Sequence, residues 1–410
     1  MIFRRQVGRV RATVAQNTGT RTDGGVPRYA GPMTPPTALA LEFRPDLDDL
    51  EPHKELRDGL SAVLQIDRTL WVANDESASV ERLTLTGKCG AGAHTQFMLH
   101  DYLDLPLPAE GDPPRPPEVD VEGLDHEGGY LWLVGSHSLK RKKPSLDDGA
   151  KNAHKQLARL SVDANRYLLA RIPVAREGDA PALARKHVHE GRKLTAARLR
   201  DATDAGEGNE LMQALRKDKH LAAYLPIPGK DNGFDVEGIA VAGPRVFLGL
   251  RGPVLRGWAA VLELRVEDDG HGLLRLAPLD KKGHLVRKHF VALGGRGVRD
   301  IRLDGEDLLL LCGPTMDLDG TISILRWPGA LRLEEPAMVP ACALEHVLDI
   351  PHGTGCDRAE GICLFVPSDG APPSLLVVYD AASEARQRGR SVLMADVFGL
   401  PPRAAYAAPR

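Results

Sequence analysis

The chain lacks any long apolar segment, and no stretch of it approaches the roughly 20 apolar residues that a bilayer-spanning helix needs. It also has few cysteines, five in all, with no Cys-x-x-Cys pair among them. An odd, scattered set argues against a disulfide framework and a structural zinc site, so we expect a reducing, cytoplasmic environment. The net charge of −3 gives the whole protein no attraction to nucleic acid or membranes.

The first 36 residues lack a continuous apolar run, although they contain six arginines and one acidic residue. They therefore do not have the pattern of a secretory signal peptide. Two interpretations stay open for residues 1–36: a disordered Arg-rich tail, or an Arg-rich transit or tethering segment. We also expect a C-terminal tail at 401–410, so that the folded body covers residues 37–400.

What the chain does contain is a recurring acidic phrase that ends in Glu-Gly and then Leu or Ile. It occurs at 120–124, 235–239 and 357–362, and weaker copies fit the same frame at 59–63 and 297–301. Successive copies lie 61 or 62 residues apart, except for one interval of 115 residues between Glu122 and Glu237. Self-similarity at a fixed period is typical of solenoids and propellers.

The segments after each copy predict an all-β fold. A short strand leads through a tight turn, such as Glu-Gly-Gly at 127–129, into a strongly apolar second strand, as at 130–134. Third and fourth alternating strands follow in most copies. Four antiparallel strands in about 60 residues make a β-propeller blade, so we predict a single propeller, with five blades as the favoured number.

Two departures from the regular pattern predict how the ring is completed. The last unit has only three good strands, so we expect residues 39–43 to supply its outer strand and close the ring. The long interval between Glu122 and Glu237 holds 54 excess residues, mostly within 174–229, and the spacing of Leu211 and Leu215 there predicts a helical insertion. A degenerate sixth blade in this interval is the alternative.

Strand direction predicts where the polar residues of the repeats meet. The first strand of a blade lines the channel and the second runs antiparallel to it, so the start of one and the end of the other share a face. Repeated carboxylates there would supply the oxygen ligands that Ca²⁺ or Mg²⁺ requires. The predicted metal ligands are Glu122, Glu237, Glu360, Asp120 and Asp235. The predicted ligand-binding residues on this face are Ser136, Asn74, Asp75, Lys140 and Arg141.

Three further residues are catalytic candidates. Arg251 and Arg299 would neutralise negative charge among the acids, because like charges in one channel repel. His137, in Gly-Ser-His-Ser at 135–138, is the candidate for proton transfer. The basic run at 140–143 would attract an anionic ligand. The alternative is that Glu and Arg form a buried ion network that only holds the blades in register.

The recurring phrase, together with Leu-Trp-Leu-Val-Gly-Ser-His-Ser at 131–138 and Lys-Asp-Asn-Gly-Phe-Asp-Val-Glu-Gly at 230–238, resembles a bacterial family known only as a domain of unknown function. The resemblance covers roughly residues 40–400. The Glu-Gly-Ile phrases are also similar to those of the esterase-like phytase propellers. That second resemblance implies a β-propeller with bound Ca²⁺ and phosphoester hydrolysis. It puts the repeated acids at Glu122, Glu237 and Glu360, whereas Arg299 and Ser61 depart from the acidic pattern.

Two functional hypotheses follow. The first is a metal-assisted hydrolase that acts on a small anionic ester, phosphoester or lactone at the central channel, with a divalent cation and no nucleotide or organic cofactor. The second is a non-catalytic binding propeller that contacts a protein partner through 140–143 and 174–229. Neither hypothesis involves a membrane or a specific nucleic acid.

Overall fold

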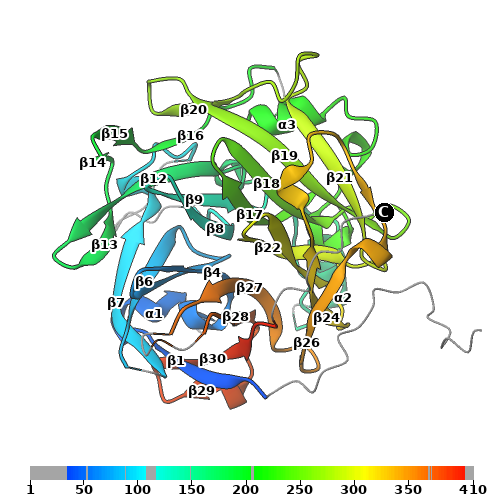
Figure 1. Ribbon diagram of the computed structural model, residues 1–410. Helices are drawn as coiled ribbons and strands as arrows, with labels where there is room; N and C mark the ends of the chain where they lie inside the picture. The colour runs from blue at the N-terminus through cyan, green and yellow to red at the C-terminus, as the bar shows by residue number, and fades with distance from the viewer. Residues whose placement is uncertain are drawn as a thin grey trace, which may run out of the picture.

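The computed structural model describes residues 35–51, 54–87, 89–107, 117–147, 149–204, 207–367, 370 and 372–401. Within these residues the strands radiate from a central axis, and the protein is a β-propeller (Figure 1). The predicted tails, 1–36 and 401–410, lie outside the described residues apart from 35, 36 and 401. The longest described helix, α2 (Ala150–Leu157), has eight residues, and no described helix could cross a membrane.

Five strands surround the axis, and each begins at a copy of the recurring phrase. They are β4 (Leu60–Ile66), β8 (Val121–Glu127), β17 (Asp235–Ala242), β22 (Gly297–Asp304) and β27 (Arg358–Phe365). Each of these inner strands contacts the next, and β27 contacts β4, so that the contacts close a ring. The period of the sequence is therefore the spacing between successive inner strands.

Each inner strand opens an antiparallel meander that runs outward. The second strands are almost wholly buried, as their apolar sequences predict: β5 (Thr69–Asn74), β9 (Tyr130–Gly135), β18 (Arg245–Gly252), β23 (Asp307–Gly313) and β28 (Ser374–Asp380). The third strands are β6 (Ser79–Leu85), β12 (Leu169–Glu177), β19 (Trp258–Asp268), β24 (Ile322–Trp327) and β30 (Val392–Gly399). The outer strands are β7 (Gly90–Met98), β13 (Ala180–Leu183), β21 (Val286–Ala292), β26 (Glu345–Ile350) and β1 (Thr37–Glu42). Five buried apolar clusters lie between successive sheets and form the core.

The N-terminal strand completes the last sheet, as predicted. β1 pairs antiparallel with β30, from Thr37 opposite Val397 to Glu42 opposite Val392. It also pairs in parallel with β7 of the first sheet at Ala40. The first and last sheets are therefore joined along their outer edges, and these edges are not left open.

The stretch 174–229 is a correction to the expected helical insertion. The helix predicted from Leu211 and Leu215 is present as α3 (Glu210–Leu215), with both leucines buried. The residues before it are mainly strands: the end of β12, then β13, β14 (Lys186–His189), β15 (Arg192–Thr195) and β16 (Ala197–Leu199). β16 pairs with β12 and with β20 (Leu273–Leu276), because an available sheet edge outweighs local helical preference. None of these strands joins the inner ring.

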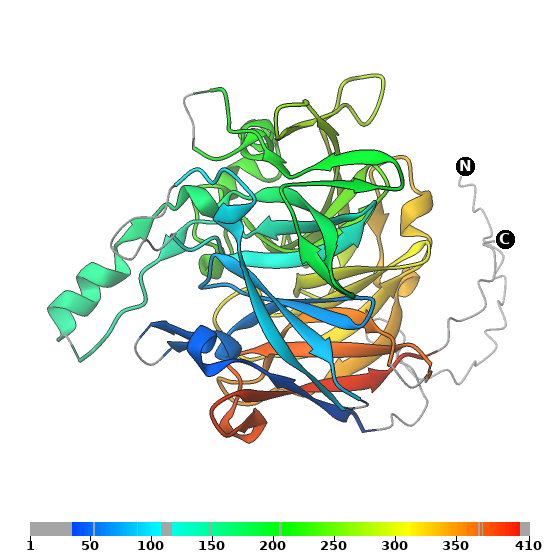
Figure 2. The same cartoon turned by 90° about the vertical axis from the view of Figure 1, so that its left-hand side faces the viewer.

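The remaining elements are short and lie outside the meanders. A projecting arm consists of β10 (Lys140–Arg141), α2 and β11 (Leu160–Ser161), and Figure 2 shows it extending away from the sheets. The others are α1 (Pro45–Asp48), β2 (Asp49–Glu51), β3 (Lys54–Glu55), β25 (Met338–Val339) and β29 (Gln387–Arg388).

Candidate functional site

Every inner strand has a β-bulge at the same position of the recurring phrase. In each sheet the pairing with the second strand skips one residue of the inner strand: Ser61, Glu122, Glu237, Arg299 and Glu360. The pairing of β17 with β18 shifts a second time and also skips Arg251 of β18. A bulged residue has no partner in the ladder, and the bend re-aims its side chain. The bulge thus accounts for a charged residue recurring in an otherwise apolar strand, and it directs these side chains toward the channel mouth.

The glycine after the bulge allows the inner strands to approach one another. A Cβ atom on Gly123 would lie 2.8 Å from the backbone nitrogen of Ile239 on the next strand. A Cβ atom on Gly238 would lie equally close to the backbone nitrogen of Ile301, and Gly361 is similarly confined. These distances are shorter than real Cβ contacts, so any side chain would force the strands apart.

One arginine closes the axis below the bulges. The guanidinium of Arg302 donates hydrogen bonds to a backbone carbonyl of each inner strand: Val63, Leu124, Ile239, Ile301 and Ile362. It also lies 2.9 Å from the carboxylate of Asp300, which stands at the glycine position of its own copy. Arg302 was missed by the sequence analysis, because it occurs in one copy only and so leaves no periodic signal.

On one side of the channel mouth, acids and arginines alternate in a continuous buried chain. Arg251 pairs with Asp235 and, at 2.5 Å between Nη1 and Oε1, with Glu237. Arg299 lies 3.0 Å from the other oxygen of Glu237 and also pairs with Glu360. Burial raises the pKa of Glu237, although both arginines oppose the shift. We call these five residues the paired half of the mouth; here arginines stand where the sequence predicted a metal ion.

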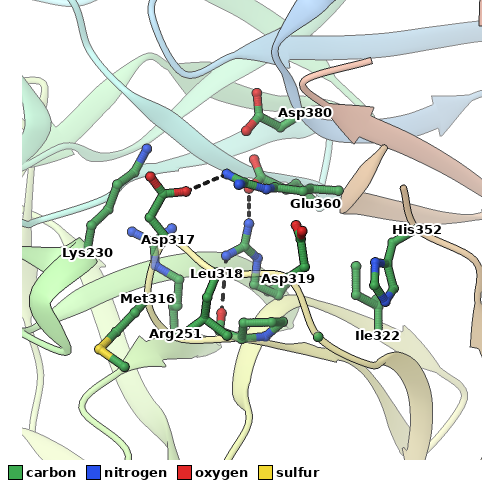
Figure 3. A pocket seen from close by; sticks show the side chains of 14 residues that line it. Lys230, Arg251, Met316, Asp317, Leu318, Asp319, Ile322, His352, Glu360 and Asp380 are labelled. Atoms are coloured by element: carbon green, nitrogen blue, oxygen red, sulfur yellow. Dashed lines mark hydrogen bonds and ion pairs between the residues drawn. The ribbon is translucent and has the colours of Figure 1, made fainter. Parts of the chain in front are cut away.

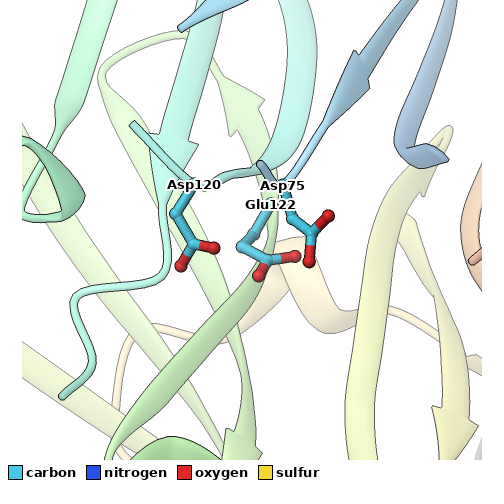
Figure 4. A group of neighbouring side chains, drawn as sticks. All are labelled: Asp75, Asp120 and Glu122. Atoms are coloured by element: carbon cyan, nitrogen blue, oxygen red, sulfur yellow. The ribbon is translucent and has the colours of Figure 1, made fainter. Parts of the chain in front are cut away.

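On the other side, three acids converge with little compensation (Figure 4). A carboxylate oxygen from each of Asp75, Asp120 and Glu122 lies within 4.8 Å of the other two. Asp120 pairs with Arg166 at 2.5 Å, whereas no described residue makes a hydrogen bond or ion pair with Glu122. Only 8% of Glu122 is exposed. We call Asp75, Asp120 and Glu122 the acidic triad.

The electrostatics of the acidic triad follow from this lack of counter-charge. Burial, then the neighbouring carboxylates of Asp120 and Glu237, raise the pKa of Glu122 well above its ordinary value. Burial and the nearby Asp380 and Asp120 do the same for the pKa of Asp75. A cation bound beside these carboxyls would oppose both upward shifts, because a nearby positive charge favours the charged form.

Local backbone structure presents two members of the acidic triad. Asn74 ends β5, where its side chain donates to the carbonyl of Leu56 at 2.8 Å and accepts from the backbone N–H of Glu76 at 2.7 Å. These bonds shape the turn that carries Asp75. Asn74, predicted to bind a ligand, is therefore a structural residue. Asp120 precedes β8 with a φ of 57°, in the left-handed region, which sets the direction of its side chain.

A narrow pocket adjoins the paired half (Figure 3). It is lined by Lys230, Arg251, Arg299, Glu360 and Asp380, together with the loop 314–320, and has a volume of about 30 Å³. That space suits a water molecule or a small ion. Lys230 is exposed and has no hydrogen bond or ion pair with any residue the structure describes. Its positive charge opposes the rise in the pKa of Asp75 and of Glu237.

His137 is a correction to the predicted proton-transfer role. Its ring is buried, with Nδ1 2.8 Å from the carbonyl oxygen of Gly135 and Nε2 2.8 Å from the side-chain nitrogen of Asn209. Burial lowers the pKa of His137 to about 4, so the ring is neutral at pH 7. Both nitrogens are occupied by structural contacts, and the ring does not line the pocket.

The remaining predicted ligand-binding residues also have structural partners. The hydroxyl of Ser136 accepts hydrogen bonds from the backbone and side chain of Ser138. Lys140 lies 2.8 Å from Glu118, and Arg141 lies 2.7 Å from Asp231. Within the basic run, Lys142 and Lys143 are exposed. Arg166, Lys230 and Asp380 are not among the site residues predicted from the sequence, yet they take more direct parts in the site.

The fold and the site define a β-propeller whose axis is closed by an arginine. Its mouth carries one set of acids paired with arginines and a second set, the acidic triad, in which Glu122 has no partner among the described residues. The chain belongs to the family described as a protein of unknown function (DUF3616), whose model matches residues 59–396. No protein of curated function matches it in sequence.

Several solved structures have a distant likeness to the chain. Streptogramin B lyase has 9% identity and a TM-score of 0.32, with 88% of this chain and 98% of that chain covered. The PQQ-bound aldose sugar dehydrogenase of Streptomyces coelicolor has 10% identity and a TM-score of 0.34, with 89% and 100% covered. The computationally designed Ika8 protein has 7% identity and a TM-score of 0.26, with 84% and 97% covered. Likenesses this distant say nothing about activity.

Proposed function

We propose that the protein is a cation-dependent hydrolase that acts on a small anionic ester or phosphoester at the mouth of its channel. The observation that carries the proposal is Glu122, a buried carboxylate without a partner among the described residues, beside Asp75 and Asp120. Leaving a buried charge uncompensated costs several kcal/mol. A bound divalent cation would remove that cost, and carboxylate oxygens are its preferred ligands.

The acidic triad would hold the cation, which would polarise the ester and lower the pKa of a bound water molecule. Lys230, free at the rim, would attract the anionic group of the substrate. Arg251 and Arg299 are already paired with carboxylates, so their part is to keep Glu237 and Glu360 neutralised beside the site. Among the described residues that line the pocket, His352 is the one histidine, and it is our candidate for proton transfer.

The proposal is tested in two stages with the full chain. After removal of metal with EDTA, calorimetric titration with CaCl₂ and MgCl₂ measures cation binding to the wild type, to Glu122→Gln and to Glu360→Gln. Glu360 occupies the same bulge position in another sheet, so its variant is a matched control. We expect binding by the wild type and the control, and at least a tenfold loss in Glu122→Gln, as for other lost cation ligands.

The second stage measures hydrolysis of p-nitrophenyl phosphate, p-nitrophenyl acetate and a lactone with and without the bound cation. Turnover that requires the cation and disappears in Glu122→Gln supports the proposal. Unchanged cation binding in Glu122→Gln contradicts it at the first stage. Cation binding without turnover of any of these substrates would contradict the hydrolase activity and favour a cation-binding protein without catalysis.

The second candidate, a non-catalytic binding propeller, is favoured by the ion pairs of the paired half. Asp235, Arg251, Glu237, Arg299 and Glu360 are linked to one another across three sheets, as a network that keeps blades in register would be. A pull-down from a bacterial extract tests whether the stretch 174–229 contacts a protein. It compares the partners retained by the intact protein with those retained by a variant that has a shortened 186–195 hairpin.

A further inference from the structure

The outer edge of β21 is open along the first part of its length. On its inner side β21 pairs antiparallel with β19, from Val286 opposite Leu264 to Ala292 opposite Trp258, without a bulge. On its outer side it is covered only by the two-residue strand β25, which pairs with Phe290 and Val291. Figure 1 shows β21 as the outermost long strand of its sheet.

The hydrogen-bond alternation identifies which backbone groups are open. The N–H of Phe290 donates outward, to the carbonyl of Ala337 at 2.9 Å. In an antiparallel ladder the outward-facing residues alternate, so Lys288 and Val286 also direct their N–H and C=O groups outward. No described residue bonds to these groups. A row of unpaired N–H and C=O groups is a template for another strand.

A groove of about 730 Å³ runs over this open edge. Besides β21, its lining comes from the segments 218–220, 279–284 and 335–338, and Met338 exposes 59% of its surface beside it. An extended peptide places alternate side chains toward such walls while its main chain pairs with the edge. The groove thus offers both main-chain and side-chain contacts.

The charge of the groove favours an acidic occupant. Two of its three acids are already paired, Asp218 with Lys288 and Asp280 with His284. The exposed ammonium groups of Lys219, Lys281 and Lys282 have no hydrogen bond or ion pair with any described residue, which leaves three positive charges against Glu335. The chain's own ends have the wrong sign, because residues 1–34 contain six arginines and one acid.

We propose that the open edge of β21 binds an extended acidic segment of a partner protein, which adds to the sheet as a further strand. The groove is lined by the outer strand β21 and its neighbouring segments and by no residue of the acidic triad, so this binding is independent of the proposed hydrolase activity. Part of its wall, residues 218–220, belongs to the stretch 174–229.

The test uses a fluorescent peptide, acetyl-Glu-Val-Glu-Val-Glu-Val-amide, and the intact protein, with fluorescence anisotropy as the readout. We expect saturable binding of this peptide that weakens with added salt, and at least tenfold weaker binding of the corresponding Lys-Val peptide. Lys281→Glu combined with Lys282→Glu should weaken binding of the acidic peptide about 2- to 30-fold, the range for two exposed charge interactions. Lys151→Glu combined with Lys155→Glu, the same charge change at two exposed positions of α2, should leave it unchanged.

Main-chain pairing is tested by N-methylation. Methylating the three Glu amides in one peptide and the three Val amides in another blocks opposite edges of the strand. One of the two should bind about 5- to 30-fold more weakly, as for the loss of one or two net hydrogen bonds, and the other should bind normally. Equal binding of the two methylated peptides would overturn the proposal, as would equal binding of the Lys-Val peptide or no binding of the acidic peptide at millimolar concentration.

Discussion

The two halves of the channel mouth use the same repeat position in opposite ways. In both, a glutamate occupies the bulge of an inner strand and is buried among other acids. In the paired half, Arg251 and Arg299 are supplied by the chain, and every carboxylate has a partner. In the acidic triad, Glu122 has none that the structure describes. The repeat therefore fixes where the acids lie, and the positions of the arginines determine which carboxylates lack an ion-pair partner.

The largest effect should come from removing an arginine of the paired half. Arg299→Met leaves Glu237 and Glu360 buried with one partner fewer, and we expect a loss of about 3–5 kcal/mol of stability in urea unfolding. The control is Arg358→Met, whose partner Asp317 is exposed, with an expected loss of no more than about 1 kcal/mol. Similar losses in the two variants would show that the paired half is not a stabilising network.

Adding a cation should stabilise the protein through the acidic triad and not through the paired half. At a Ca²⁺ concentration 100 times the dissociation constant, the wild type should gain about 2.7 kcal/mol of stability. At the same Ca²⁺ concentration Glu122→Gln should gain no more than about 1.4 kcal/mol, because its affinity is at least tenfold lower, and Glu360→Gln should keep the full gain whatever its own stability. The measurement is the urea midpoint of each protein with Ca²⁺ and with EDTA. If Glu360→Gln lost the gain and Glu122→Gln kept it, the cation would bind in the paired half and not at the acidic triad.

The pH dependence of the metal-free protein gives a third distinction. The pKa values of Glu122 and Asp75 are raised in the folded protein, so both stay protonated there at pH values where the unfolded chain has ionised them. Stability should therefore fall as the pH rises above about 4.5, by up to about 1.4 kcal/mol per pH unit for each such carboxyl. Glu122→Gln should make this slope shallower in EDTA. An unchanged slope would mean that Glu122 ionises normally.

The smallest effect concerns the rim of the mouth. Lys230→Gln should weaken the binding of inorganic phosphate about 2- to 5-fold, because an exposed charge contributes less than about 1 kcal/mol. Stability should change by less than about 0.5 kcal/mol. Lys142→Gln, an equal charge change on the projecting arm, should leave phosphate binding unaffected. Equal weakening in both would indicate a general charge effect.

The repeats made the fold predictable, because each copy has to satisfy the same constraints. The bulge requires one residue directed at the channel, and the crowded axis admits only glycine after Glu122 and Glu237. Both requirements recur at a fixed interval and are visible in the sequence. The outer strand β1 was also predictable, because an incomplete last sheet leaves only one segment to fill it.

The partners of the acids were less predictable, because they do not follow the period. Arg166, which pairs with Asp120, lies in a short turn far along the second sheet, and Arg302 occurs in one copy only. His137 stands beside the mouth in sequence, yet its contacts with Asn209 depend on a helix in the stretch 174–229. Tertiary contacts of this kind decide which polar residues remain free, and no spacing records them.

The guanidinium of Arg302, tied to all five inner strands, makes the channel a blind vestibule rather than a tunnel. Whatever reaches the acidic triad has to arrive and depart through the same opening. In the hydrolase that we propose, a product would leave through the opening by which the next substrate enters. Product release would then set an upper bound on turnover.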